Sequence, residues 1–435
     1  MENEMEIIRF IVWCINLFLV IRLVFCGQKE TQSTWAWILL LLNLPLVGLC
    51  LYFLTGQGVQ KEEQGNVRDN PESVTEDNQV RILIHGEEKF QSLLEDLQNA
   101  KKEILIQYYI YKEDFLLDKL CQILYEKASQ GVKVRVLYDA FGSRKIKKRR
   151  WTQMRQKGIL VKCYRHSVIR NFLSVICGFN YRNHRKIVVV DQYIGYIGGY
   201  NVGKEYLGMD SKFGHWRDTH FKIVGSGVNS LRNVFLRDWG EKEKCNVYQG
   251  GKKGSTVQIV TSGPASDTPH IRNVYLRCIG NAGKIIRIQT PYFIPDTAVL
   301  NALKLALLSG KRVELMIPCK PDHMFVYWAT RYYAAQLLKH GAKIYIYQKG
   351  FLHAKGIIMD EDVYCFGTAN MDIRSFYLNY EVNAIVYGSE EVKKMCQIFE
   401  QDLQDCQELT CQEYVSRSLI IRVKEQISRL LSPLL

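Results

Sequence analysis

Two segments of the chain carry the same pattern of chemically active side chains. The pattern consists of His184, Lys186, Asp191 and Asn201 in the first copy, and of His353, Lys355, Asp360 and Asn370 in the second. His and Lys are separated by two positions, Lys and Asp by five, and Asp and Asn by ten, in both copies. One His-x-Lys pair arises easily by chance on a surface, but two copies with matched intervals indicate a single shared catalytic site.

These residue types suit the transfer of a phosphodiester. One neutral His can attack the phosphorus, and one protonated His can donate to the leaving oxygen. Lys186 and Lys355, together with the amides of Asn201 and Asn370, would hold the phosphoryl oxygens as negative charge develops on them. This scheme uses side chains alone, so we expect neither a metal ion nor another cofactor.

The spacing also predicts how the backbone presents these groups. The apolar runs 186–191 and 355–360 are typical of strands, in which residues two apart point to one face. His and Lys of each copy should therefore enter one pocket. Asp191 and Asp360 fall on the opposite face, which favours a role in stabilising the structure over contact with substrate.

Each imidazole also needs an acceptor that orients its second ring nitrogen. Asp218 and Glu381 are our candidates, because each follows its motif on a later predicted strand. Asp372 is the fallback.

The elements around the motifs recur in the same order in both halves. In the first half, strands are predicted at 80–84, 103–111, 132–138 and 159–164, and helices at 87–101 and 115–130. In the second half, strands are predicted at 256–261, 284–291, 312–318 and 342–347, and helices at 269–281, 297–308 and 325–340. Alternation of this kind predicts an α/β fold, and its recurrence predicts an internal duplication. We expect two lobes, 79–250 and 251–411, that form one pseudo-twofold unit.

The N-terminal region contains two apolar runs, Ile7–Phe25 and Trp35–Leu54. Each is about 20 residues long, enough for a helix to cross a bilayer. They predict a transmembrane helical hairpin within residues 1–56. A cleaved signal peptide and a buried helical pair are the alternatives, but the first run lacks a basic leader and an A-x-A-like cleavage site. Arg22 is the costly residue inside this span.

Charge and composition extend this prediction. The net charge of +14 suits an anionic partner, whether nucleic acid, a membrane surface or a phosphate-bearing substrate. Lys61, Arg68 and the basic run 144–150 follow the spans, which places the catalytic part in the cytoplasm of a multi-pass cell-membrane protein. The 13 Cys lack C-x-x-C spacing and fit reduced thiols. The polar segment 57–78 reads as a tether.

The duplicated motifs resemble the half-sites of the phospholipase D superfamily over about residues 80–400, and within it the chain is similar to bacterial cardiolipin synthases. The supporting segments are Trp35-Ala36-Trp37, Pro45-Leu46-Val47-Gly48, 290–295, Leu378-Asn379-Tyr380-Glu381 and 431–435. The two His, two Lys and two Asp match the family motif, and Asp218 and Glu381 match its His-orienting carboxylates. Asn201 and Asn370 match the Asn of a Gly-Ser-x-Asn element, although Gly199 and Thr368 stand where Ser is common.

The resemblance implies a two-step transfer. One phosphatidylglycerol would form a phosphatidyl-histidine and release glycerol, and the hydroxyl of a second would then take the phosphatidyl group to give cardiolipin. His184 would be the nucleophile and His353 the acid by analogy, although the near symmetry leaves the reverse open. The expected partners are an anionic phospholipid and the bilayer, without nucleic acid, and the oligomeric state stays open.

Other functions remain to be weighed against this one. In a phospholipase D hydrolase, water would take the second step and phosphatidic acid would be released. A membrane-tethered nuclease is disfavoured by the hairpin, because nucleic-acid chemistry needs no bilayer anchor. A lipid-binding scaffold without activity is disfavoured by the two complete half-sites.

Three further segments allow two interpretations each. Residues 412–435 predict a C-terminal amphipathic helix, with apolar residues at helical spacing among Arg and Lys, that either packs on the domain or binds a membrane. The insert 165–183 either admits lipid or forms a packed surface helix. The basic run 144–150 either holds anionic headgroups or is an ordinary solvated face.

Overall fold

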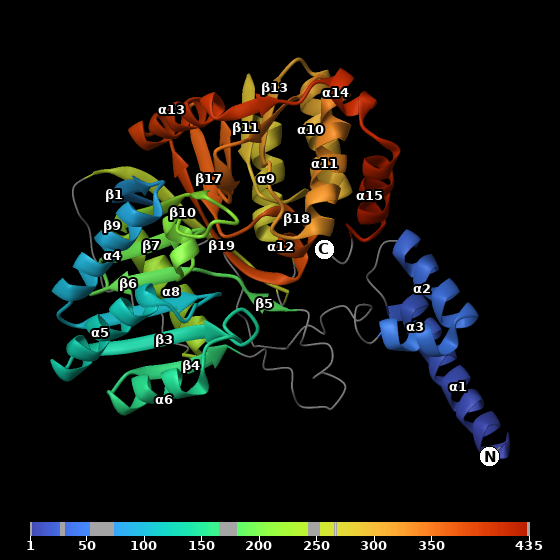
Figure 1. Cartoon of the computed structure of the whole chain (residues 1–435), viewed down its shortest axis with the longest axis horizontal. Coiled ribbons are helices and arrows are strands. Elements are labelled where there is room, and N and C mark those ends of the chain that lie inside the picture. The colour runs from blue at the N-terminus through green and yellow to red at the C-terminus, as the bar shows by residue number, and fades with distance from the viewer. Residues whose placement is uncertain are drawn as a thin grey trace. The chain divides into compact units, whose positions relative to one another are not determined.

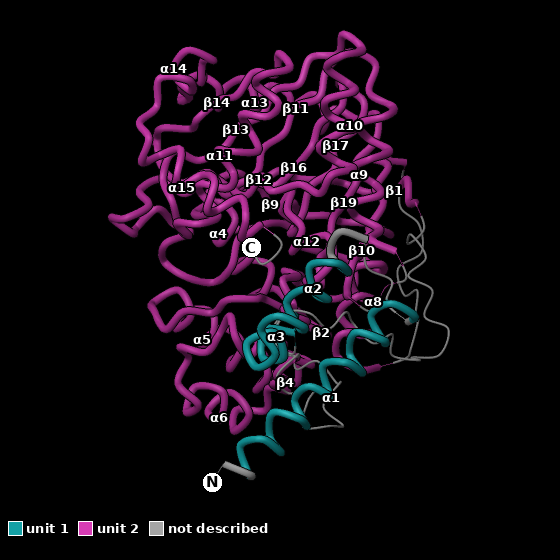
Figure 2. Tube along the Cα trace, turned by 90° about the vertical axis from the view of Figure 1, so that its right-hand side faces the viewer, with its two compact units in different colours: residues 1–64, 166–181 teal, residues 65–165, 182–435 magenta. Residues whose placement is uncertain are grey.

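The computed structural model describes residues 2–26, 31–52, 74–164, 181–241, 253–264, 266 and 268–432. They belong to two compact units, one with the N-terminal helices and one with all the strands (Figure 2). Most of the predicted tether 57–78, most of the insert 165–183 and the expected lobe boundary near 250 lie outside the described residues.

The N-terminal unit contains helices α1 Glu2–Cys26, α2 Thr31–Asn43 and α3 Pro45–Leu51. Residues Glu4–Phe25 of α1 form a helix long and apolar enough to cross a membrane. The second apolar run is divided at Leu44, because Pro45 has no N–H to continue the helix and favours an extended residue before it. Asn16 donates to the carbonyl of Pro45 at 3.0 Å and so links α1 to α3.

The second unit begins with the first lobe (Figure 1). Its elements are β1 Thr75–Leu83, α4 Gly86–Asn99, β2 Glu103–Tyr108, α5 Phe115–Ser129, β3 Lys133–Asp139, α6 Lys148–Gln156, β4 Leu160–Tyr164, β5 Arg182–Asn183, β6 Ile187–Val190, β7 Ile194–Gly198, a 3-10 turn Lys204–Leu207, β8 His215–Arg217, β9 His220–Val224 and α8 Gly227–Trp239. The first strand begins at Thr75, so the last residues of the predicted tether belong to the sheet.

The second lobe repeats this order. Its elements are β10 Ser255–Ser262, α9 His270–Asn281, β11 Ile285–Gln289, β12 Phe293–Ile294, α10 Thr297–Leu308, β13 Arg312–Pro318, α11 Met324–Leu338, β14 Lys343–Tyr347, β15 Gly350–Leu352, β16 Gly356–Met359, β17 Val363–Gly367, β18 Met371–Asp372, α12 Ile373–Tyr377, β19 Asn379–Tyr387 and α13 Glu390–Gln404.

One sheet runs through both lobes of the described chain. Outward from the antiparallel pair β1–β10, the order β9-β7-β6-β2-β3-β4 on one side repeats as β19-β17-β16-β11-β13-β14 on the other. Within this repeated order the two outer pairs of each half are parallel, and the pairs nearer the centre are antiparallel. A short antiparallel strand, β20 Cys406–Glu408, adds to the outer edge of β14. This mirrored order confirms the predicted duplication of an α/β fold.

The two lobes share part of their hydrophobic core. Helices α4, α5 and α6 cover the strands of the first lobe in one cluster, and α9, α10 and α11 cover those of the second in another. A third cluster joins apolar residues of α8 and α13 to the central strands of both lobes, including Ile187, Phe221 and Ile358. Burial of this shared apolar surface stabilises the lobes together.

The C-terminal segment continues as β20 Cys406–Glu408, α14 Cys411–Ser416 and α15 Leu419–Leu430. The single helix expected over 412–435 is therefore two helices, because Arg417 leaves the helical conformation and Ser418 caps the next helix through the N–H of Ile421. Helix α15 packs beside α11 on the second lobe (Figure 1).

Candidate active site

Each His-x-Lys segment is anchored by the opposite lobe. His184 follows β5, which pairs in parallel with β19, and His353 follows β15, which pairs in parallel with β8. The backbone N–H of His184 donates to the carbonyl of Tyr380 at 2.9 Å, and that of His353 donates to Arg217 at 2.7 Å. The two lobes thus exchange short strands, and this exchange brings the motifs together.

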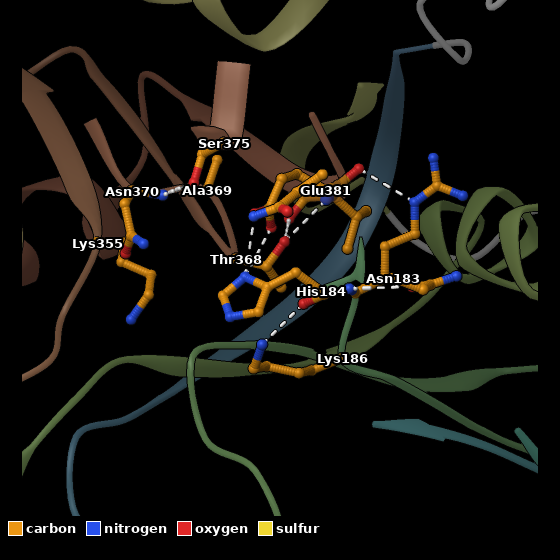
Figure 3. Close-up of polar contacts among 12 residues, drawn as sticks. Asn183, His184, Lys186, Lys355, Thr368, Ala369, Asn370, Ser375 and Glu381 are labelled. Atoms are coloured by element: carbon orange, nitrogen blue, oxygen red, sulfur yellow. Dashed lines mark hydrogen bonds and ion pairs between the residues drawn. The ribbon is translucent and has the colours of Figure 1, made fainter. Parts of the chain in front are cut away.

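The carboxylates are exchanged in the same way. Nδ1 of His184 lies 3.0 Å from both oxygens of Glu381 (Figure 3), and Nδ1 of His353 lies 2.6 Å from Oδ2 of Asp218. Each Nδ1–H donates to a carboxylate of the other lobe, which leaves Nε2 of each ring with its lone pair. The fallback residue, Asp372, instead accepts from the backbone N–H of Ser375 and caps α12.

The two lysines lie beside the imidazoles. Lys186 Nζ donates to the carbonyl of His184 at 2.7 Å, and Lys355 Nζ donates to that of His353. Lys355 Nζ is also 2.9 Å from Nδ1 of His353, but that nitrogen already donates to Asp218, so this is a close approach of two donors. His-x-Lys spacing places both groups of each motif together, as expected for extended backbone.

Burial shapes the electrostatics of this cluster. It lowers the pKa of Lys186 to about 7 and that of Lys355 to about 8, although the neighbouring carboxylates raise both. It also lowers the pKa of His184, and lowers that of His353 to about 4; Lys355 adds to the effect on both rings, and Lys186 adds to that on His184. At neutral pH both imidazoles are therefore neutral, and the lysine ammonium groups lose their protons easily.

The carboxylates remain ionised. Burial raises the pKa of Asp218, but Lys355 and His353 more than offset this effect and leave it below its ordinary value. The pKa of Glu381 is likewise raised by burial and lowered further by His184 and Lys186. Both groups therefore serve as permanent acceptors for the imidazole N–H.

The two asparagines differ in their surroundings. Asn201 bonds at both ends of its amide, accepting from the N–H of Ile110 at 3.2 Å and donating to the hydroxyl of Tyr206 at 2.8 Å. Asn370 lies near Lys355 (Figure 3), and its buried Oδ1 has no hydrogen-bond partner among the described residues. The second-lobe amide is therefore the one with unused hydrogen-bonding capacity, which suits contact with a ligand.

The motif aspartates lie away from this cluster. Strands β6 and β16 end at Val190 and Met359, one residue earlier than predicted, and Asp191 and Asp360 follow with φ of 49° and 51°. The carboxylate of each accepts from three successive backbone N–H groups at the start of β2 or β11. Neither carboxylate contacts a motif His or Lys.

The positions after the strand-ending glycines also differ between lobes. Gly199 lies against Asp218, and a Cβ there would come within 2.1 Å of the carboxylate oxygen. The equivalent Thr368 has a side chain whose hydroxyl accepts from the N–H of Val382 at 2.9 Å and lowers the pKa of Glu381. A short carboxylate thus accompanies Gly in one lobe, and a longer one accompanies Thr in the other.

Two buried arginines that the motif spacing did not reveal brace this arrangement. Arg185 donates to the carbonyl of Glu381 at 3.1 Å and pairs with Asp238 of α8 at 2.5 Å. Arg217 donates to the backbone carbonyl of Asp218 and pairs with Asp402 of α13 at 2.8 Å. Arg185 stands between His184 and Lys186, and Arg217 directly precedes Asp218, so neither interrupts an apolar run and no local pattern marked them as buried. A buried charge is costly unless it is paired.

A basic rim lies beside His184; its Arg144 and Arg182 belong to segments that the sequence had singled out, and its Arg374 does not. The ring of Tyr109 is 5.0 Å from the imidazole. Burial and Asp139 raise the pKa of Tyr109, while Arg182, Arg374 and Arg144 act in the opposite direction. These guanidinium groups have no matched counterparts in the two motifs, so the repeat could not reveal them. No group of three or more His, Cys, Asp or Glu side chains is arranged like metal ligands in the part of the chain that the structure describes.

Comparison with known proteins agrees with the two-lobed organisation of the chain. The family described as "Cardiolipin synthase, PLD-like domain" matches residues 93–239 and 275–403, which fall in the two lobes, and the phospholipase D-nuclease N-terminal family matches residues 14–57. The chain is 42% identical to the major cardiolipin synthase ClsA of Bacillus subtilis (strain 168), covering 99% of both chains. It is also 42% identical to a cardiolipin synthase of Oceanobacillus iheyensis, covering 98% of both.

Among solved structures, the fold resembles that of a phosphatidylserine synthase from Haemophilus influenzae Rd KW20. The TM-score is 0.63 at 15% identity, over 82% of this chain and 95% of that one. At this identity the likeness concerns the fold alone, and it agrees with the two-lobed sheet. The near full-length identity to curated relatives and the match of both lobes show that the chain belongs to the cardiolipin synthase family of the phospholipase D superfamily.

Proposed function

We propose that the chain is a membrane-bound phosphatidyltransferase that makes cardiolipin and glycerol from two molecules of phosphatidylglycerol. The observation that supports this proposal is the exchange of carboxylates, which holds each imidazole through Nδ1 and leaves its Nε2 available to a phosphodiester. The names of the relatives support the choice of lipid substrate.

In the first step, Nε2 of His184 attacks the phosphorus of one phosphatidylglycerol. A P–N bond forms and the bond to the glycerol oxygen breaks, and His353 gives its Nε2 proton to that oxygen. Glu381 stabilises the positive charge that develops on His184. Lys186 and Lys355, with the amide N–H of Asn370, donate to the phosphoryl oxygens.

In the second step, the free headgroup hydroxyl of another phosphatidylglycerol attacks the same phosphorus. His353 takes the hydroxyl proton, a new P–O bond forms, and the P–N bond to His184 breaks. One phosphodiester replaces another, so no nucleotide is needed. If water enters instead, the product is phosphatidic acid, which makes access of the acceptor the feature that separates transfer from hydrolysis.

The substrate itself adjusts the protonation of the site. Both imidazoles are neutral without substrate, and a neutral His184 is the form that can attack. An anionic phosphodiester raises the pKa of nearby cationic groups. Binding therefore raises the pKa of Lys186 and Lys355, which favours the charged forms that donate to phosphoryl oxygens, and raises that of His353 toward the protonated form that the first step requires.

The membrane anchor completes the proposal. Helix α1 can span a bilayer, and α2 with α3 adds a second apolar segment, which Asn16 of α1 joins by donating to the carbonyl of Pro45. We place the protein in the cell membrane as a helical hairpin with the catalytic unit in the cytoplasm. Arg22 lies four residues before the end of α1, from where its long side chain can extend toward the interface.

Purified full-length protein in vesicles of phosphatidylglycerol tests the proposal. Without nucleotide, we expect one glycerol to be released for each cardiolipin formed, and denatured protein trapped during turnover should carry lipid phosphorus on histidine. His184→Ala should abolish both signals.

Two results would count against the proposal. Phosphatidic acid as the sole lipid product would make the enzyme a hydrolase. Lipid phosphorus retained on His184→Ala but lost from His353→Ala would reverse the roles of the two histidines.

A further inference from the structure

Helix α15 is packed with its apolar side outward. Its exposed apolar side chains, with 47 to 75% of their surface accessible, are Leu419, Ile420, Val423, Ile427 and Leu430. Most of these positions are three or four residues apart, so they form one stripe along the helix. An amphipathic helix on a globular domain normally buries such a stripe, and this one leaves it uncovered within the described residues.

Polar groups hold the inward face of the helix. Glu425 and Ser428 are buried, three residues apart. The carboxylate of Glu425 accepts from the hydroxyl of Tyr414 at 3.0 Å and pairs with Arg417 at 2.8 Å. A charged residue is costly to bury unless it is paired, so this network fixes which face of α15 meets the domain.

Basic side chains flank the apolar stripe. The helical positions of Arg422 and Arg429 put them on one side of it and Lys424 on the other. Lys424 Nζ lies 5.3 Å from the ring centre of Trp328, and the guanidinium of Arg429 lies 5.4 Å from that of Tyr332. An exposed apolar stripe between cationic flanks is the pattern of helices that lie in the interface of an anionic bilayer.

We infer that α15 is a second membrane contact, which docks the second lobe on the surface of an anionic bilayer. The apolar stripe of α15 contacts lipid rather than another copy of the chain. Two such stripes facing each other would bring their basic flanks together, and these like charges would repel. The inference rests on the proposed function only in that the substrate is taken from a bilayer. It gives the catalytic unit a fixed attachment in addition to the N-terminal helices.

A photocrosslinking residue placed at Ile427 tests the contact without relying on activity. The full-length protein is incorporated in nanodiscs of phosphatidylglycerol and phosphatidylcholine, and the control carries the same residue at the exposed Glu390 of α13. We expect lipid adducts at least fivefold more abundant from position 427 than from position 390. Adducts to a second copy, adducts to residues 1–56, or equal lipid labelling at both positions would overturn the inference.

A pair of charge substitutions tests whether the contact of α15 with the bilayer supports turnover. Ile420→Asp with Ile427→Asp should lower turnover in phosphatidylglycerol vesicles by about tenfold while leaving it within twofold in mixed detergent micelles. The matched control, Gln397→Asp with Gln401→Asp, adds the same charge at exposed positions of α13. An equal loss for both variants, or no loss for the first, would show that α15 does not dock. If no variant of the enzyme makes cardiolipin, the crosslinking result still decides this inference alone.

Discussion

The absence of a side chain at Gly199 explains how the first lobe accommodates its short carboxylate. Asp218 is fully buried, with Oδ2 on His353 and Oδ1 accepting from the N–H of Thr219 at 2.7 Å. Any Cβ at position 199 would overlap that carboxylate. In the second lobe Thr368 and Glu381 take the same two places with more volume in both side chains.

The first prediction concerns this pairing of residue sizes. Gly199→Ser should move Asp218 from His353 and lower kcat by about 100-fold, because a displacement near 1 Å at a catalytic group has an effect of that size. Adding Asp218→Glu should recover activity to within about tenfold, since Thr368 and Glu381 already pair in this way. Steady-state kinetics in phosphatidylglycerol micelles measure both changes.

Gly280→Ala serves as the control for this pair. Its Cβ would meet nothing within 4 Å, so activity and melting temperature should stay unchanged. If Gly199→Ser kept full activity, the position of Asp218 would not limit catalysis.

The residues of the site were predictable to different degrees. Matched spacing identified both His and both Lys, because a repeat leaves the same mark twice in a sequence. The spacing could not show that Glu381 serves His184 and Asp218 serves His353, since strand exchange between lobes is a tertiary feature. The buried role of Arg185 could not be predicted for the same reason, because its partner, Asp238, lies on α8.

At the scale of elements, Asp191 and Asp360 act as clamps between strands. Each lies just past the end of its strand and accepts from three backbone N–H groups that begin a neighbouring strand. Burial raises the pKa of Asp360, but the N–H groups of Gly283, Ile285 and Lys284 lower it further, to below its ordinary value. The carboxylate therefore stabilises the folded state above the pKa of the unfolded chain.

The second prediction tests this clamp. Asp360→Asn should lower the free energy of unfolding by about 2 kcal/mol at neutral pH, because an amide replaces a charged acceptor of three hydrogen bonds. A carboxylate whose folded pKa is depressed loses its contribution as the pH falls through that pKa. The difference between the two proteins should thus shrink on acidification, as measured by thermal unfolding from pH 7 to pH 3.

Asp362→Asn provides the control in the same turn, because Asp362 is exposed. Its unfolding should match that of the parent protein. A loss of turnover in fully folded Asp360→Asn would instead give Asp360 a part in the chemistry.

Sequence patterns predicted some elements closely and failed at others for physical reasons. The bounds of α10 and β13 match the prediction, because capping by Asp296 and a mostly apolar run that ends at Pro318 are local signals. The start of β1 was missed, since its polar first residues are held by pairing with β10. The division at Leu44 could be expected from Pro45, whereas the outward apolar face of α15 depends on the buried Glu425.

At the scale of the whole molecule, the duplicated lobes form one folded body. The mirrored sheet, the cluster shared by α8 and α13, and the exchanged strands all join the two halves. Each half supplies one His and one Lys, and each supplies the carboxylate that the other half needs. The pseudo-twofold arrangement therefore forms a single site from one chain.

The third prediction follows from this arrangement. His184→Ala and His353→Ala should each reduce turnover by at least 1,000-fold, because removal of one member of a catalytic pair leaves little of its rate. Because both histidines of a site come from the same chain, a mixture of the two variants, coexpressed with different affinity tags and purified together, should stay equally inactive. Recovery of about a quarter of the parental rate would mean that chains exchange lobes and build the site between copies. Retention of half the rate by either single variant would mean that the two motifs work independently.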